Sequence, residues 1–185
     1  MGQYLAIGLV TVANVSKKEL EQGNITPPEL IAEMERQLHF HPQLYEMQET
    51  ANGFIFNLKQ DVLQAQLLPF LEEFYPFVYD EDSEDGYEKV LTRLRTTEPS
   101  TWLALAEGKY FYSLQEDRYG HGDTLYFKKD FEPKVRISYK HIMLSMEGKI
   151  IMESYGRQFH FFKHCMVQTF AKYPLAGALR VYITG

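Results

Sequence analysis

The sequence is poor in cysteine and has no long apolar run. Its single cysteine, at position 165 of 185 residues, cannot close an internal disulfide. An oxidising compartment therefore offers this chain no advantage, and the reducing cytosol suits it. No apolar run reaches the roughly 20 residues that a bilayer-spanning helix needs. The apolar first segment lacks the Lys or Arg that begins a secretory signal peptide. We therefore expect a soluble, cytoplasmic protein with no membrane partner.

Basic residues are in the minority. The chain has 19 Lys and Arg against 25 Asp and Glu, which gives a formal net charge of -6 at pH 7. A net negative surface repels a phosphate backbone unless a dense basic patch overrides it. The densest basic stretches, Arg93 to Arg95 and Lys128 to Arg136, are short and interrupted. We expect no nucleic-acid partner.

The signatures of the large enzyme classes are also missing. The sequence contains no G-x-S-x-G elbow, no P-loop, no glycine fingerprint of a dinucleotide site and no catalytic cysteine motif. These absences favour a protein that is not an enzyme and that holds no cofactor.

What the chain does have is material for a core. Hydrophobic residues make up 45% of it, and 13 Phe and 13 Tyr raise the aromatic share to 15%. A chain of this length and composition folds and buries a sizeable core without disulfides. We expect a single domain spanning 1–185, with any subdivision falling near the acidic stretch at 80–86.

The first third of the sequence shows alternating strand and helix signals. Residues 4–12 are uninterrupted by charge, as is typical of a central strand buried on both faces. Two capping boxes predict helix starts, one with Ser16 and Glu19 and the other with Thr26 and Glu29.

The apolar spacing that follows predicts a second helix, a hairpin and a third helix. The second helix has a core-facing stripe of Ile31, Met34 and Leu38. Segments 44–49 and 53–59 read as strands joined by a turn. After Asp61, leucines recur at helical spacing at positions 63, 67 and 71. Pro69 must either kink this helix or mark its start, and Pro76 is expected to close it.

Beyond the acidic stretch the signals are mostly those of strands. Short helices are expected at 87–95 and 100–108, strands near 110–114, 125–127 and 135–139, a final helix at 157–173 and a last strand at 178–184. Residues 141–155 fit a hairpin turning at 147–148 and also fit a helix; we favour the hairpin. This order predicts an α+β fold with a mostly antiparallel sheet and helices packed on one face. A ferredoxin-like frame with the middle third inserted is the expected topology.

The histidines are the first candidate site. His160 and His164 lie four apart beside Cys165, and His39 and His41 form a second pair. A metalloprotease helix carries Glu directly after its first His, whereas this chain has Phe161 there. We therefore interpret these side chains as structural and expect no metal. The alternative is a metal-dependent hydrolase in which the two histidine pairs converge.

The acidic stretch "DEDSEDG" is the second candidate site. It fails as a calcium loop, because Asp85 stands where the loop needs Gly and Leu91 stands where it needs Glu. Clustered carboxylates with tyrosines beside them are typical of a surface that attracts a cation-rich protein. The predicted partner-binding residues are Tyr79, Asp80, Glu81, Asp82, Glu84, Asp85 and Tyr87. We expect a non-enzymatic, inhibitor-type or immunity-like protein that binds another protein with a basic surface.

Overall fold

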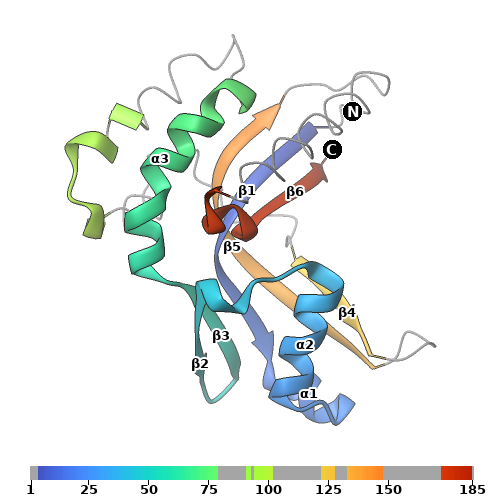
Figure 1. The fold of residues 1–185 in the computed structure, drawn as a ribbon. Coiled ribbons are helices and arrows are strands. Elements are labelled where there is room, and N and C mark those ends of the chain that lie inside the picture. The colour runs from blue at the N-terminus through green and yellow to red at the C-terminus, as the bar shows by residue number, and fades with distance from the viewer. Residues whose placement is uncertain are drawn as a thin grey trace. The chain divides into compact units, whose positions relative to one another are not determined.

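The computed structural model of the chain describes residues 4–78, 91–92, 94–101, 122–127, 133–147 and 172–184. The elements, in chain order, are β1 (Tyr4–Ser16), α1 (Lys17–Gly23), α2 (Pro27–Leu38), η1 (Pro42–Leu44), β2 (Tyr45–Glu49), β3 (Gly53–Leu58), α3 (Gln60–Val78), η3 (Pro99–Thr101), β4 (Gly122–Tyr126), β5 (Lys134–Glu147), η4 (Pro174–Ala178) and β6 (Leu179–Thr184). Helices and an antiparallel sheet together confirm the predicted α+β class (Figure 1).

The sheet has β1 as a central strand, as predicted, although β1 continues to Ser16. The strand order is β2-β3-β1-β5-β4, and β6 also pairs with β1. The pairings of β6 with β1, β1 with β3 and β3 with β2 are all antiparallel, but the strand order places β1 between β3 and β5, so the ferredoxin-like topology stays a prediction. Here β6 pairs with residues 4–9 of β1 and β3 with residues 12–16, while β5 is an additional neighbour.

The chain groups into two compact units, each built from separated segments. The first unit comprises Met1–Leu9, Gln60–Leu114 and Ile142–Gly185, and the second comprises Val10–Lys59 and Gln115–His141. That the whole chain folds as one domain stays a prediction.

In the first unit, α3 runs from Gln60 to Val78 through both of its prolines. The prediction that Pro76 closes this helix is therefore wrong, as is a helix start at Pro69. Proline removes one backbone hydrogen bond, but burial of Leu63, Leu67 and Leu71, each at most 1% exposed, holds the helix together. Neither α3 nor any other helix in the described part of the chain is long and apolar enough to cross a membrane.

Polar contacts hold the segment from Lys172 to Leu175 against α3. The Glu73 carboxylate accepts hydrogen bonds from Lys172 Nζ at 2.5 Å and from the Tyr173 hydroxyl at 2.9 Å. These bonds, chiefly the one from Lys172, lower the pKa of Glu73, and the same pair raises the pKa of Lys172. The Gln66 side chain accepts the backbone N–H of Leu175 at 2.9 Å.

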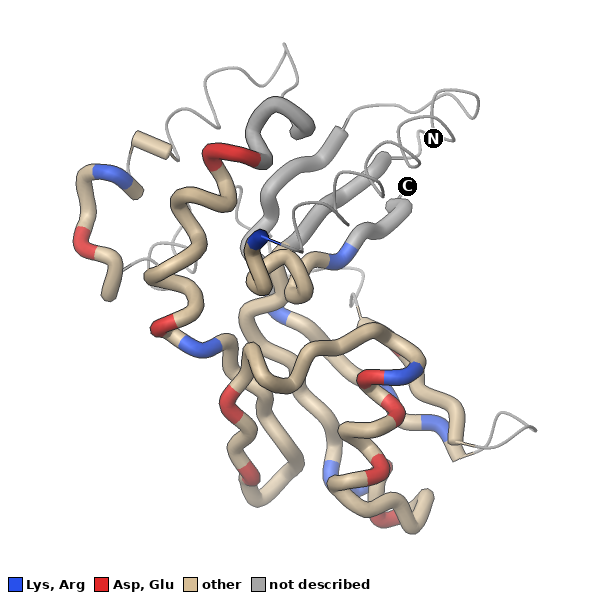
Figure 2. The backbone as a smooth tube through the Cα atoms, viewed as in Figure 1, with Lys and Arg blue, Asp and Glu red and all other residues tan. Residues whose placement is uncertain are grey.

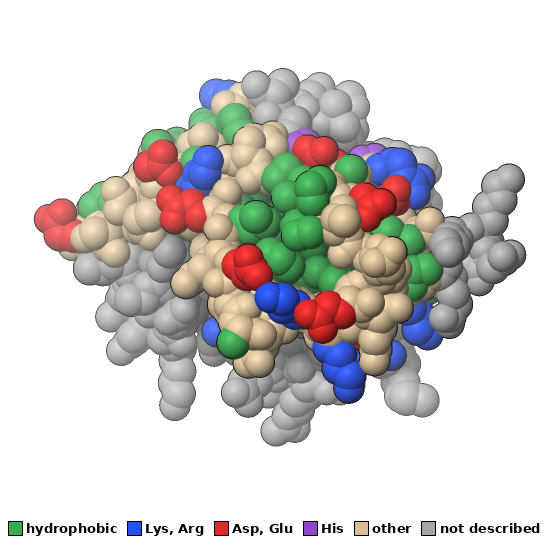
Figure 3. Space-filling model, turned by 90° about the horizontal axis from the view of Figure 1, so that it is seen from below, with side chains coloured by type: hydrophobic (Ala, Val, Ile, Leu, Met, Phe, Trp, Pro, Cys, Tyr) green, Lys and Arg blue, Asp and Glu red, His purple; other side chains and the backbone are tan. Residues whose placement is uncertain are grey.

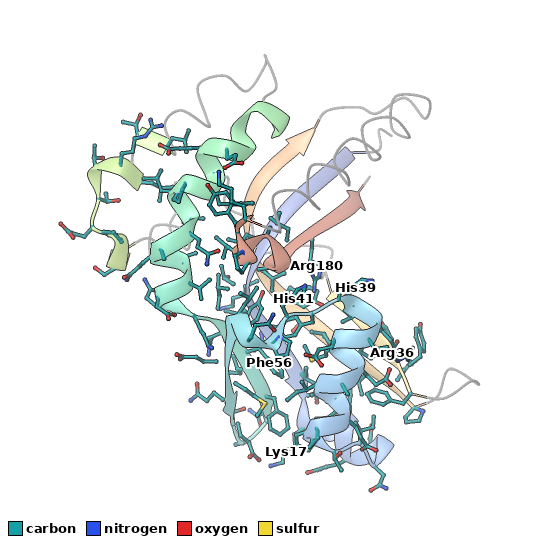
Figure 4. The ribbon with its side chains drawn as sticks, viewed as in Figure 1. Lys17, Arg36, His39, His41, Phe56 and Arg180 are labelled. Atoms are coloured by element: carbon teal, nitrogen blue, oxygen red, sulfur yellow. The ribbon has the colours of Figure 1, made fainter. Side chains whose placement is uncertain are left out.

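In the second unit, β2 and β3 form the predicted hairpin, and α1 and α2 bury Leu20, Leu30 and Met34. The predicted stripe of α2 is slightly rotated, because Leu30 and Met34 are fully buried while Ile31 and Leu38 are only half-buried. An aromatic cluster completes this core: the Phe40 ring stacks on Tyr45, with ring centres 4.6 Å apart, and meets Phe56 edge-on at 5.6 Å. Phe56 is labelled in Figure 4.

One of the two predicted capping boxes is present. The Thr26 N–H donates to Glu29 at 2.8 Å, and the Glu29 N–H donates back to Thr26 Oγ1 at 3.5 Å. The Ser16 box is wrong, because Ser16 makes no side-chain cap bond. Its expected partner, Glu19, instead accepts the backbone N–H of Arg136 at 2.7 Å.

In the later part of the chain, β5 extends to Glu147. The strand interpretation of 141–147 is thereby confirmed, and the helical alternative is wrong for these residues. The last strand is confirmed as β6, and residues 91–92 and 94–96 are helical, as expected for the 87–95 segment. The predicted strand at 110–114 and the final helix up to residue 171 lie outside the described residues.

Candidate functional site

The sheet of the second unit has one buried face and one polar face. Cross-strand pairs of apolar residues, Ala13 with Phe56, Val15 with Phe54 and Leu125 with Val135, point into the core. Because side chains alternate along a strand, the intervening residues share the opposite face. These intervening pairs are Asn14 with Ile55, Ser16 with Gly53, Thr124 with Arg136 and Gly122 with Ser138.

A groove of about 800 Å³ opens on this part of the second unit. The ends of β1, β3, β4 and β5 line it, together with the β2–β3 turn and Glu19 of α1. The polar lining residues are Asn14, Ser16, Glu19, Thr50, Asn52, Asp123, Thr124, Arg136 and Ser138. Val15, Phe54, Ile55 and Ile137 supply its apolar part. We call this site the β-groove.

Two glycines allow the strands of the β-groove to lie as they do. A Cβ atom on Gly53 would stand 1.9 Å from the carbonyl oxygen of Val15, and one on Gly122 would stand 2.1 Å from that of Ile137. Both oxygens belong to the backbone and have little freedom to move aside. Glycine is therefore required at both positions, and neither position projects a side chain into the groove.

The carboxylates of the β-groove are already engaged. Glu19 accepts the backbone N–H of Arg136, so this N–H is bonded to a side chain and not to a neighbouring strand. Asp123 accepts the Tyr139 hydroxyl at 2.7 Å. The guanidinium of Arg136 is exposed and forms no hydrogen bond or ion pair with any described residue. The groove therefore offers a ligand one available cation together with hydroxyl and amide groups.

This set of groups is suited to binding. Amides and hydroxyls both donate and accept hydrogen bonds, and guanidinium donates to planar anions. The described lining residues include no histidine or cysteine, the side chains that most often act as acid–base or thiolate catalysts. The arrangement could form hydrogen bonds with polar groups of a ligand.

The predicted partner-binding residues, from Tyr79 to Tyr87, lie outside the described residues, as do His160, His164 and Cys165. His39 and His41 are described, in the connection between α2 and η1 (Figure 4). His39 has a left-handed backbone, φ 51°, at the C-terminal end of α2, so this segment is not extended. This position is at the negative pole of the α2 dipole, which agrees with a structural interpretation of His39. His41 Nδ1 lies 3.3 Å from the Gln43 amide nitrogen.

Within the described ranges, no group of three or more His, Cys, Asp or Glu side chains is placed to hold a metal ion. Convergence of the two histidine pairs stays a prediction, because one pair lies outside these ranges.

Hydrophobic side chains also gather on the surface. Figure 3 shows hydrophobic side chains gathered on the lower face and bordered by acidic and basic ones. Among the described large hydrophobic side chains, Met47 is 48% exposed and Tyr126 is 40% exposed. Met47 belongs to β2, an edge strand of the sheet, and does not line the groove.

The β-groove was not predicted from the sequence. The signal that was available was the alternation in residues 53–58 and 135–139, which implies outward-facing polar residues. Alternation does not reveal which strands become neighbours, and the groove exists only because four strand ends meet.

Comparison with known proteins gives no likeness. No protein-family model, no curated protein and no solved structure matches the chain.

Proposed function

We propose that this protein is a non-enzymatic binding protein that holds an extended segment of another protein in the β-groove. The observation that carries the proposal is the open, polar character of the groove. Ser16, Gly122, Arg136 and Ser138 line it and are all exposed. Small-molecule sites enclose most of their ligand's surface, whereas grooves on sheets accept extended peptides.

The lining residues match the groups that a peptide presents. An extended chain presents one N–H and one C=O group per residue, and successive residues are about 3.3 Å apart. The amides of Asn14 and Asn52 and the hydroxyls of Ser16, Thr124 and Ser138 can each donate and accept. Ile55, which is partly exposed on the same face, adds apolar contact area in the groove.

Selection from a random peptide library tests the proposal. Replacing Ser138 with Trp fills the groove from an exposed position on β5. Gln48→Trp is the matched control, since Gln48 is exposed on the same sheet face, opposite Ile55, but does not line the groove. Peptides selected on the wild-type protein are expected to bind Gln48→Trp and not Ser138→Trp. Equal binding to both variants, or the failure of selection to yield any binder, would refute the proposal.

A second candidate is the predicted acidic surface from Tyr79 to Tyr87. Five of its nine residues, 79 to 87, are Asp or Glu, and a negative cluster of this density speeds encounter with a cation-rich partner. This acidic surface would bind a partner with a basic surface, in the manner of an immunity-type or inhibitor protein.

A further inference from the structure

A row of cationic side chains runs along the polar face of β5. Lys134, Arg136 and Lys140 are all exposed, and Val135, Ile137 and Tyr139 between them are buried. The three cations therefore share one face, with Ser138 completing the row. None of the three side chains forms a hydrogen bond or ion pair with a described residue. The row is therefore a locally positive area in a chain whose net charge is -6.

This row is not evident in the sequence. In "KKDFEPKVRISYK" the basic residues are interrupted by acidic and apolar ones, and the stretch reads as diluted charge. Because successive side chains of a strand point to opposite faces, the apolar residues lie on one face and the basic residues lie together on the other.

The charges around the row indicate which sign of ligand charge it attracts. Of the two described carboxylates that line the β-groove, Asp123 pairs with buried Ile137 and so lies on the other face of the sheet, while Glu19 keeps its negative charge and stands against three cations. Figure 2 shows that acidic positions outnumber basic ones on α2, whereas basic positions recur along β5. An anionic ligand is repelled by α2 and drawn to β5.

We infer that the segment bound in the β-groove is acidic, with Asp or Glu side chains at alternate positions that pair with Arg136 and the flanking Lys134 and Lys140. This inference rests on the proposed function. Residues of the same face recur about 6.6 Å apart both on β5 and on an extended peptide beside it, so the two charge patterns coincide. Arg136, within the groove, can hold a carboxylate through two parallel N–H bonds.

A peptide fits this row better than a nucleic acid does. Proteins that bind single-stranded nucleic acid commonly use aromatic side chains on which successive bases stack. Tyr126, paired with Lys134, is the one large aromatic side chain counted as exposed among the described residues.

Fluorescence anisotropy with three labelled probes tests the inference: an alternating Glu-Ser peptide, its Gln-Ser counterpart and an oligothymidylate. The variants are Arg136→Gln, Arg136→Lys and, as a control, Lys18→Gln, which removes an exposed cation from α1. Unfolding temperatures establish that each variant is folded. We expect the Glu-Ser peptide to bind, with affinity falling about tenfold or more for Arg136→Gln, less for Arg136→Lys and not at all for Lys18→Gln. Added salt should weaken this binding.

The outcomes separate the inference from the function on which it rests. If the Gln-Ser peptide binds as tightly as the Glu-Ser peptide, and Ser138→Trp abolishes both, the acidic segment is refuted while the groove remains a peptide site. If only the oligonucleotide binds in an Arg136-dependent manner, the ligand is a nucleic acid and the inference is refuted. If no peptide binds, from these probes or from the random library, both the inference and the proposed function fall.

Discussion

The hydrogen bond between the Glu19 side chain and the backbone of β5 leads to a different prediction from the one that the sequence pattern alone would give. "SKKE" predicts a capping box, in which Ser16 stabilises the start of α1 and Glu19 assists. The structure assigns Glu19 to the N–H of Arg136, 2.7 Å away, and leaves Ser16 without a cap bond. We expect Glu19→Ala to destabilise the protein and Ser16→Ala to leave its stability nearly unchanged.

The magnitude follows from the geometry of this bond. A hydrogen bond to a charged group contributes about 1.5–3 kcal/mol. Arg136 is exposed, so water can replace the carboxylate, and the lower end, about 1.5 kcal/mol, applies. For a chain of this size that corresponds to a fall in unfolding temperature of about 3–6 °C. Glu19→Gln keeps a neutral acceptor and should lose about half as much.

Thermal unfolding followed by circular dichroism measures the loss, and amide exchange by NMR locates it. The Arg136 amide should exchange faster in Glu19→Ala than in the wild-type protein. Glu21→Ala is the matched control, since Glu21 is an exposed glutamate of the same helix. The reasoning is refuted if Ser16→Ala costs about 1 kcal/mol, as a working cap would, and exchange at Arg136 is unchanged in Glu19→Ala.

Other predictions follow from the core, the surface charges and the undescribed segments. Phe56→Ala should cost about 3–5 kcal/mol in urea unfolding, because Phe56 is 1% exposed and its ring meets Phe40. Glu73→Gln should lower the unfolding temperature at neutral pH. Hydrogen bonding lowers the pKa of Glu73 in the folded protein below its ordinary 4.5, so the ionised side chain stabilises the fold above pH 4.5 and this stabilisation disappears as the pH falls through the lowered pKa. If the unfolding temperatures of the variant and the wild-type protein still differ below that pH, the prediction is contradicted. Neutralising the acidic residues 80–85 with Ser or Asn should remove partners captured by the wild-type protein, and unchanged partners discard that surface. Elemental analysis of protein purified without a histidine tag should find no stoichiometric transition metal; finding one promotes the hydrolase alternative.

Local signals in the sequence were enough to identify many elements. The capping box at Thr26, the hairpin between residues 44 and 59 and the leucine spacing of α3 each depend on neighbours a few residues apart. Such short-range patterns are encoded directly in the order of residues. The α+β class follows from the order of those elements.

Packing decided where the local rules failed. Proline disfavours a helix interior, yet α3 passes through Pro69 and Pro76, with a row of buried leucines along its first two-thirds. Glu19 had a plausible local partner and took a distant one, 117 residues along the chain. In both places contacts between distant residues outweighed a short-range preference.

By itself the sequence determined the α+β class, the excess of acidic charge and the alternation that gives each strand a polar side. Only the tertiary structure decided that the ends of β1, β3, β4 and β5 meet, that Gly53 and Gly122 approach neighbouring backbone carbonyls too closely for a side chain, and that three cations of β5 stand in one row beside the groove. The physical reason is that alternation is a property of one strand, whereas a site on a sheet depends on which strands pair and in which register.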